Sequence, residues 1–163
     1  MSYENNIRLE RKFANEIKAI LGLQFIGQDP IMDKQQGTDF LVFSIAPIKV
    51  GLRLRTYRYY QNPEYRNQFT IRFKLASGAK TEYQKIKEGL VQYILYGFVD
   101  ETETKMVQYF IGDLSVFNEY EAGMKTEIHQ NKDKNPSWLK AYYIKDFPKE
   151  FIIKFWQSQK PLL

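Results

Sequence analysis

The segment KVGLRLR, residues 49–55, alternates apolar side chains with glycine or basic ones. Because successive side chains of a β-strand point to opposite faces, its valine and leucines share one face, and Arg53 and Arg55 share the other. We expect the apolar face to pack in a core and the basic face to meet an anion. That anion could be a carboxylate of the protein or a phosphate of a nucleic acid, or the arginines could simply be solvated.

Residues 68–76, QFTIRFKLA, show the same alternation, with Arg72 and Lys74 on the polar face. The segment between the two strands contains Asn62-Pro63, which favours a turn, so we predict a hairpin with an aromatic tip. Tyrosines and arginines interleave in this tip, a pattern suited to base stacking and phosphate contacts. The alternatives are a tyrosine-rich loop that packs on the protein itself and a basic face that is exposed to solvent.

The rest of the chain predicts a single α/β domain. Residues 7–21 repeat apolar side chains at helical spacing, with Glu10 inside the apolar stripe. Short strands are expected in 23–27, 38–45 and 105–114, and a helix over 81–97 that starts with a capping box, Thr81 and Gln84. A last helix is expected from Pro148. In this order, helices flank a mixed central sheet.

Composition narrows the function. The chain has no cysteine and a single histidine, His129, to which we assign no role, so thiolate and paired-histidine metal sites are excluded. A glycine-rich phosphate loop and a nucleophile elbow are also missing from the sequence. No apolar segment has the length of about 20 residues that a membrane helix needs, and the N-terminus lacks a signal-like apolar region, so we expect a cytoplasmic protein with no membrane partner.

The positive charge is unevenly distributed. The formal net charge is +5, and every arginine lies between residues 8 and 72. Because the guanidinium group forms a bidentate fork that matches phosphate, this asymmetry predicts nucleic acid as the partner of the first half of the chain. The alternative is that the arginines form internal ion pairs.

Three features together resemble the PD-(D/E)XK, or restriction-endonuclease-like, superfamily. They are Glu10 in the first helix, Asp39 of "GTD" at the head of a strand, and a polar i, i+2 pair in the following strand "VGLRLR". The resemblance covers residues 7–112 and implies an α-β-β-β-α-β core, to which we add a helical extension over residues 113–163 that packs on it. It also implies that acids hold a divalent metal, usually magnesium, while a lysine positions or activates the attacking water.

The chain departs from this pattern where the superfamily has acid-X-Lys, because Arg53 and Arg55 stand there instead. Arginine cannot act as a general base near neutral pH, but it can hold a phosphate. In the superfamily the third acid and the lysine can migrate to the next helix, which implies Glu82 and Lys85 here. The resemblance thus implies that Glu10, Asp39 and Glu82 hold Mg²⁺.

We therefore expect a nucleic-acid-binding protein that hydrolyses phosphodiester bonds, with DNA expected ahead of RNA. The expected catalytic residues are Asp39, Glu82, Lys85 and Arg53. Contacts with nucleic acid are expected from Arg53, Arg55, Arg58, Arg66, Arg72, Lys74, Tyr59 and Tyr60.

Two other functions remain open. One is a catalytically inactive nucleic-acid-binding or protein-interaction module on the same fold, derived from a phage or mobile element. The other is a structural subunit of a phage or mobile-element assembly. Each acid also has a plain structural explanation. Glu10 could pair with Arg53 or Arg72, Asp39 could form a turn, and Glu82 could stabilise a helix N-terminus, while Lys85 could be solvated.

Overall fold

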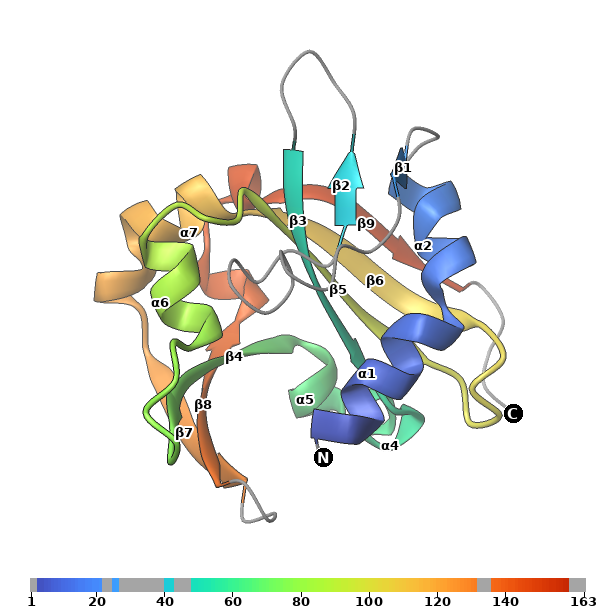
Figure 1. Ribbon diagram of the computed structural model, residues 1–163, viewed down its shortest axis with the longest axis horizontal. Helices are drawn as coiled ribbons and strands as arrows, with labels where there is room; N and C mark the ends of the chain where they lie inside the picture. Colours follow the sequence, from blue (N-terminus) through green and yellow to red (C-terminus); the bar gives the residue numbers. More distant parts are fainter. Residues whose placement is uncertain (1–2, 22–24, 27–39, 43–47, 132–135, 159–163) are drawn as a thin grey trace.

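The computed structural model describes residues 3–21, 25–26, 40–42, 48–131 and 136–158 of the 163-residue chain. These residues form two β-sheets with helices packed against them (Figure 1). The mixed α/β class expected from the sequence is therefore confirmed. None of the helices in these ranges is both long and apolar enough to cross a membrane.

The larger sheet is mixed and the smaller one is antiparallel. The larger sheet has the strand order β1-β2-β3-β5-β6-β9, with bounds Phe25–Ile26, Phe40–Val42, Ile48–Arg55, Tyr93–Val99, Met106–Asp113 and Ile152–Gln157. The smaller sheet has the order β4-β8-β7, with bounds Gln68–Leu75, Ser137–Tyr143 and Thr126–Asn131. β3 and β5 pair in parallel, and every other described pair is antiparallel. The strands predicted within 23–27, 38–45 and 105–114 are present as β1, β2 and β6.

Helices precede the sheets and connect their strands. Their bounds are Tyr3–Lys12 (α1), Ala14–Leu21 (α2), Tyr57–Gln61 (α4), Pro63–Arg66 (α5), Glu82–Lys87 (α6) and Leu114–Tyr120 (α7), with short 3₁₀ turns at Glu121–Gly123 (η1), Ile144–Asp146 (η2) and Lys149–Phe151 (η3). The helix predicted over residues 7–21 is confirmed as α1 and α2, which meet at Phe13. The amide of Phe13 still donates to the carbonyl of Leu9, at 2.9 Å, so the helical path continues through the junction.

One face of the larger sheet packs against α1 and α2. Val50, Leu52 and Leu54 of β3 are buried there in one cluster with Leu9, Phe13 and Ile17 of the helices. The helical residues are four apart, so they form a single stripe along the helix. The apolar face predicted for this strand is confirmed.

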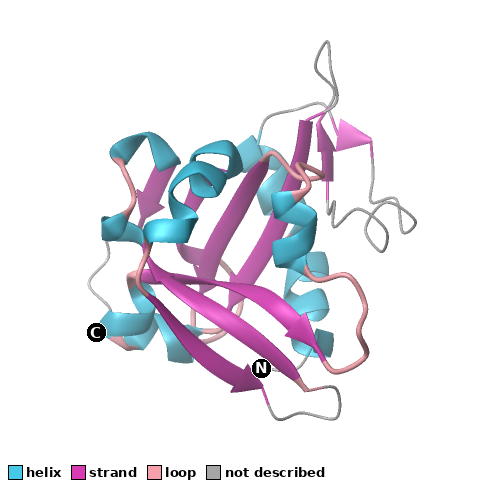
Figure 2. Ribbon diagram, turned by 90° about the vertical axis from the view of Figure 1, so that its left-hand side faces the viewer, coloured by secondary structure: helices cyan, strands magenta, loops and turns pink. Residues whose placement is uncertain are grey.

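The other face of the larger sheet meets the smaller sheet across an aromatic core (Figure 2). Phe69 of β4 lies at its centre and stacks on Tyr142 and Phe151, with ring centroids 5.4 Å and 5.3 Å away. It also meets Tyr96 and Phe110 of the larger sheet edge-on, at 6.2 Å and 5.7 Å. Such offset and edge-to-face contacts add to the stabilisation that burial alone supplies. The two sheets are therefore joined mainly by aromatic side chains.

The predicted hairpin between residues 48–55 and 68–76 is wrong. β3 pairs with β2 and β5, whereas β4 pairs with β8 in the other sheet. The intervening residues form α4 and α5 instead of a turn, because Asn62 caps the amide of Glu64 at 2.9 Å and Pro63 occupies the first position of α5. Proline is favoured at that position because its missing N–H needs no partner there. Alternation identified both strands but could not specify their partners.

The predicted helix over 81–97 is correct only at its start. The capping box is present, since the Thr81 hydroxyl accepts from the amide of Gln84 and the Thr81 amide donates to Gln84 Oε1, at 3.2 Å and 2.8 Å. The helix ends at Lys87, and Gly89 adopts a left-handed backbone with φ of 69° that reverses the chain. The following apolar run forms β5, because it is buried on both faces like a central strand rather than on one stripe like a helix.

The expected helical extension contains α7 and short 3₁₀ turns but also three strands, β7, β8 and β9. β8 pairs with β4 and β9 pairs with β6, so the described residues after 113 contribute strands to both sheets. The helix predicted from Pro148 is wrong, because Pro148 precedes the single turn η3 and the chain then enters β9. Pairing with β6 supplies β9 with interstrand hydrogen bonds that a helix would have formed internally.

A buried carboxylate joins three elements behind the aromatic core. Glu121 of η1 accepts hydrogen bonds from the hydroxyls of Tyr83 and Tyr142, both at 2.8 Å, and from Lys140 Nζ at 3.0 Å. Burial raises the pKa of Glu121, but the hydrogen bonds from these three side chains outweigh that effect and hold the pKa below its usual value. The carboxylate therefore stabilises the fold in its charged form.

We expect Glu121→Gln to lower the free energy of unfolding by about 1–3 kcal/mol at neutral pH, because the charge-assisted hydrogen bonds are lost. A carboxylate whose pKa is depressed in the folded state stabilises the fold above its ordinary value of 4.5 and loses this effect as the pH falls through the folded pKa. The deficit of the variant should therefore shrink in acid. Urea unfolding at several pH values measures it, with Glu119→Gln on the exposed side of α7 as control. Equal deficits for the two variants would contradict the prediction.

Candidate nucleic-acid interface

The basic face of β3 is buried between the two sheets. Arg53 lies opposite Tyr96 and Arg55 opposite Phe98 in the parallel pairing with β5. Their exposed fractions are 5% and 6%. The alternative in which this face is solvated is therefore wrong for these two arginines. A buried guanidinium is costly unless an anion compensates it, so the partner of each one matters.

The partner of Arg53 is Glu82 in the first turn of α6. Glu82 Oε2 accepts from Arg53 Nη2 and, at 3.0 Å, from the backbone amide of Arg72 in β4. Burial lowers the pKa of Arg53, but the carboxylates of Glu82 and Glu10 and the hydroxyl of Tyr96 more than offset this, and the pKa is raised. Two of the acids predicted to hold a metal thus both interact with one buried cation.

Of the other two residues in the predicted catalytic group, the structure describes Lys85 but not Asp39. Lys85 is half-buried on α6, one turn after Glu82. Asp39 lies outside the described residues. Within the ranges that the structure describes, no three acidic or histidine side chains gather in a group that could hold a metal ion. The Mg²⁺ site therefore stays a prediction.

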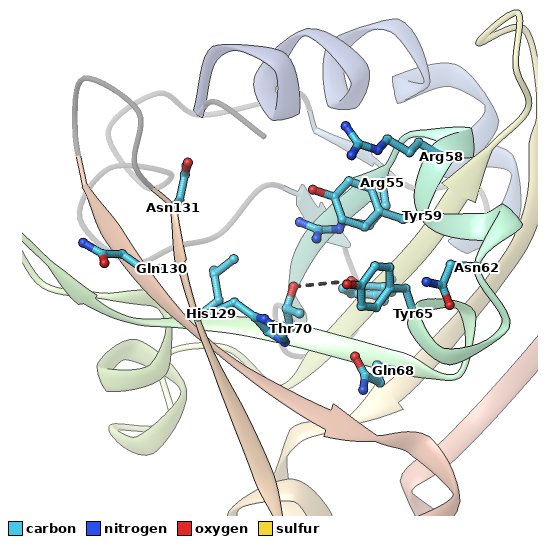
Figure 3. Close-up of a pocket in the computed structure, with 12 residues that line it drawn as sticks. Arg55, Arg58, Tyr59, Asn62, Tyr65, Gln68, Thr70, His129, Gln130 and Asn131 are labelled. Carbon is cyan, nitrogen blue, oxygen red and sulfur yellow. Dashed lines mark hydrogen bonds between the residues drawn. The ribbon is translucent and has the colours of Figure 1, made fainter.

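A pocket of about 430 Å³ lies beside Arg55, between the two sheets (Figure 3). The larger sheet and the α4–α5 segment contribute Arg55, Arg58, Tyr59, Asn62, Tyr65 and Tyr96. The smaller sheet contributes Gln68, Thr70, His129, Gln130, Asn131 and Leu139. The hydroxyls of Thr70 and Tyr96 lie 3.4 Å apart and link the two sheets inside the pocket. None of the described residues that line it is acidic.

Arg55 is the buried cation of this pocket. Its guanidinium carbon lies 4.0 Å from the centroid of the Tyr59 ring, a cation–π contact. It forms no ion pair with any carboxylate in the described part of the chain. Arg58, three residues further along the chain in α4, is exposed. The pocket therefore presents positive charge that the described side chains leave unneutralised.

Aromatic rings occupy the wall next to the arginines. Tyr59 and Tyr65 lie 5.9 Å apart at a tilt of 49°, and Tyr65 meets the ring of His129 edge-on at 6.5 Å. Tyr65 is 38% exposed, so part of its ring is open to a ligand. Glu127 reaches His129 Nε2 at 3.4 Å but does not line the pocket.

The other predicted contact residues lie away from this pocket. Tyr60 is 3% exposed and packs on Phe98, so it contributes to the core. The guanidinium of Arg66 lies 5.4 Å from the Tyr60 ring. Arg72 and Lys74 follow on β4 but do not line the pocket, and Lys74 Nζ lies 4.8 Å from the Trp138 ring.

Sequence reasoning missed the polar residues that the smaller sheet supplies. Gln68, Thr70 and His129 reach the pocket because β4 and β7 both pair with β8. His129 lies opposite Leu139 in that pairing, which places both side chains on the same face. No local pattern in residues 126–131 indicates that they would meet an arginine of β3.

Because Glu82 bridges Arg53 and the backbone of β4, its substitution should lower the stability of the fold. We expect Glu82→Ala to lower the free energy of unfolding by about 2–3 kcal/mol, because it removes the partner of a buried guanidinium. Glu82→Gln should lower it less, since an amide oxygen still accepts from the Arg72 backbone. Glu88→Ala, at the C-cap of α6, is the matched control, because it breaks an exposed ion pair with Lys80, which precedes the helix, and should change stability by less than about 1 kcal/mol. Thermal or urea unfolding that ranks Glu82→Ala with Glu88→Ala would contradict the bridge.

Comparison of the chain with protein-family models, with curated proteins and with solved structures found no match. The resemblance to the restriction-endonuclease-like superfamily therefore stays a prediction carried by the order of elements and a few side chains.

Proposed function

We propose that this chain is a nucleic-acid-binding protein that holds phosphate groups with Arg55 and Arg58. One observation carries the proposal: Arg55 is 6% exposed, faces a pocket, and has no carboxylate partner among the described residues. Buried charges in proteins are normally paired, so an anionic ligand is the natural complement of this side chain. Arginine suits phosphate in particular, because its planar fork matches two phosphate oxygens.

The aromatic wall of the pocket favours a nucleic acid over a simple anion. Tyr59 and Tyr65 stand beside the two arginines, and tyrosine rings offer stacking surfaces for bases. The excess of positive charge in the chain, +5, adds a sequence-independent attraction to polyanions. A phosphate site flanked by stacking surfaces is what a nucleotide unit requires.

The order of elements supports the further proposal of a restriction-endonuclease-like core. The helices α1 and α2 are followed by β1, β2 and β3, which pair antiparallel, and then by α6 and by β5, which pairs parallel to β3. This is the α-β-β-β-α-β order that the resemblance implies, with α4, α5 and β4 inserted after the third strand.

The same geometry favours a binding module without catalysis over a nuclease. A Mg²⁺ ion beside Glu82 would lie close to the guanidinium that Glu82 already pairs with, and two cations there would repel each other. Glu10 also acts on that guanidinium. The described residues therefore fit a structural ion pair better than a metal site, and magnesium-dependent cleavage is the alternative that a variant of Asp39 tests.

Binding should be strongly salt-dependent. We expect Arg58→Gln to weaken binding of a labelled oligonucleotide and to flatten the plot of log affinity against log salt by roughly 0.7–0.9, because one phosphate contact is lost. Arg55→Gln should weaken binding further, since its charge is buried and less screened. Lys105→Gln, an exposed cation in the turn between β5 and β6, is the control and should change neither quantity. Binding that is independent of salt, or absent at micromolar protein in low salt, would contradict the proposal.

Cleavage is tested on wild type and Asp39→Asn with magnesium or manganese, on single- and double-stranded DNA and RNA. We expect no cleavage by the wild type, because Glu82 and Glu10 act on Arg53. Cleavage that Asp39→Asn abolishes, while oligonucleotide binding persists, would establish the nuclease instead.

A further inference from the structure

We infer that the pocket holds one unpaired nucleotide, so that the partner is a single-stranded nucleic acid or a single-stranded segment of a longer one. This inference rests on the proposed function, and it adds the class of nucleic acid and the side chain that holds the base. It assigns the phosphate to Arg55 and Arg58 and the base to the open ring of Tyr65.

The burial of Arg55 favours a single strand over a duplex. Proteins that read duplex DNA insert protruding helices or strands into its grooves. Arg55 is recessed instead, since it is 6% exposed and lines a pocket between two sheets. The stiff backbone of a duplex cannot bend into such a recess, whereas a single strand can turn one phosphate and its base inward.

The volume of the pocket indicates a single nucleotide as its occupant. About 430 Å³ falls in the range of pockets that enclose small molecules, so it suits one nucleotide unit and not a stretch of duplex. In Figure 3, Arg55 and Arg58 lie on the same side of the pocket as Tyr59, and His129 enters from the smaller sheet. A nucleotide whose phosphate contacts the two arginines would therefore place its base near the aromatic rings of the pocket.

The exposed ring of Tyr65 is the surface on which we expect the base to stack. The Tyr59 ring is already covered by the Arg55 guanidinium at 4.0 Å, whereas Tyr65 is 38% exposed at the rim. Asn62 and Gln130 also line the pocket, and their amides can both donate and accept hydrogen bonds. Together they offer a stacking surface with polar groups near the edge of a base, which is how unpaired bases are commonly bound.

The test compares labelled oligothymidylate, oligouridylate of equal length and a blunt-ended duplex by fluorescence anisotropy. We expect either single strand to bind at least about tenfold more tightly than the duplex. Tyr65→Ala should weaken single-strand binding by roughly 5- to 150-fold, the range that loss of one stacked base produces. The control is Tyr120→Ala on α7, a tyrosine that is 43% exposed and does not line the pocket, and it should bind like wild type.

A competition experiment examines the two halves of the pocket separately. Thymidine or uridine monophosphate should displace the labelled strand at lower concentration than inorganic phosphate does, and Tyr65→Ala should remove this difference while Tyr120→Ala keeps it. Preference for the DNA or the RNA strand supports the inference in either case.

The failures of the two proposals can be told apart. A duplex that binds as tightly as the single strands, or a Tyr65→Ala variant that binds them like wild type, would overturn this inference and leave nucleic-acid binding standing. Absence of binding to all three oligonucleotides would overturn both.

Discussion

The two sheets are tied together by one carboxylate oxygen. Glu82 Oε2 accepts from Arg53 on β3 of the larger sheet and from the backbone amide of Arg72 on β4 of the smaller sheet. The aromatic contacts around Phe69 bury apolar surface between the sheets, but the hydrophobic effect that favours this burial is non-directional. Hydrogen bonds are directional, so this bridge constrains how β3, α6 and β4 lie relative to one another. Whether such a pair also adds net stability depends on the cost of desolvating both groups.

This constraint also determines the pocket. β3 carries Arg53 and Arg55 on the same face, so the ion pair that fixes the first arginine between the sheets places the second beside it. The first is neutralised by Glu82, and the second faces a lining without an acidic side chain in the described residues. Two identical side chains two residues apart thus have different surroundings, since one pairs with a carboxylate and the other lines a pocket.

The inserted helices complete this division of roles. α4 and α5 bring Tyr59 over the Arg55 guanidinium and Tyr65 to the rim, while Tyr60, between them in sequence, turns into the core against Phe98. A five-residue helix separates neighbouring side chains by about 100° each, so adjacent tyrosines cannot all face one ligand. The tyrosine-rich segment is therefore partly core and partly pocket: packing on the protein itself is shown for Tyr60, whereas base stacking remains a proposal for the tyrosines of the pocket.

The sequence by itself determined the local features. Alternation in 49–55 placed its leucines in a core, the stripe in 7–21 formed helices, and Thr81 with Gln84 marked a helix start, because each pattern is read from neighbours along the chain. The pairing of the basic strands, the strand character of 93–99 and the arrival of Gln68 and His129 at the pocket were decided by tertiary structure. Strand partners are chosen by long-range packing, so no spacing in the sequence encodes that β4 joins β8 and leaves Arg55 facing a pocket.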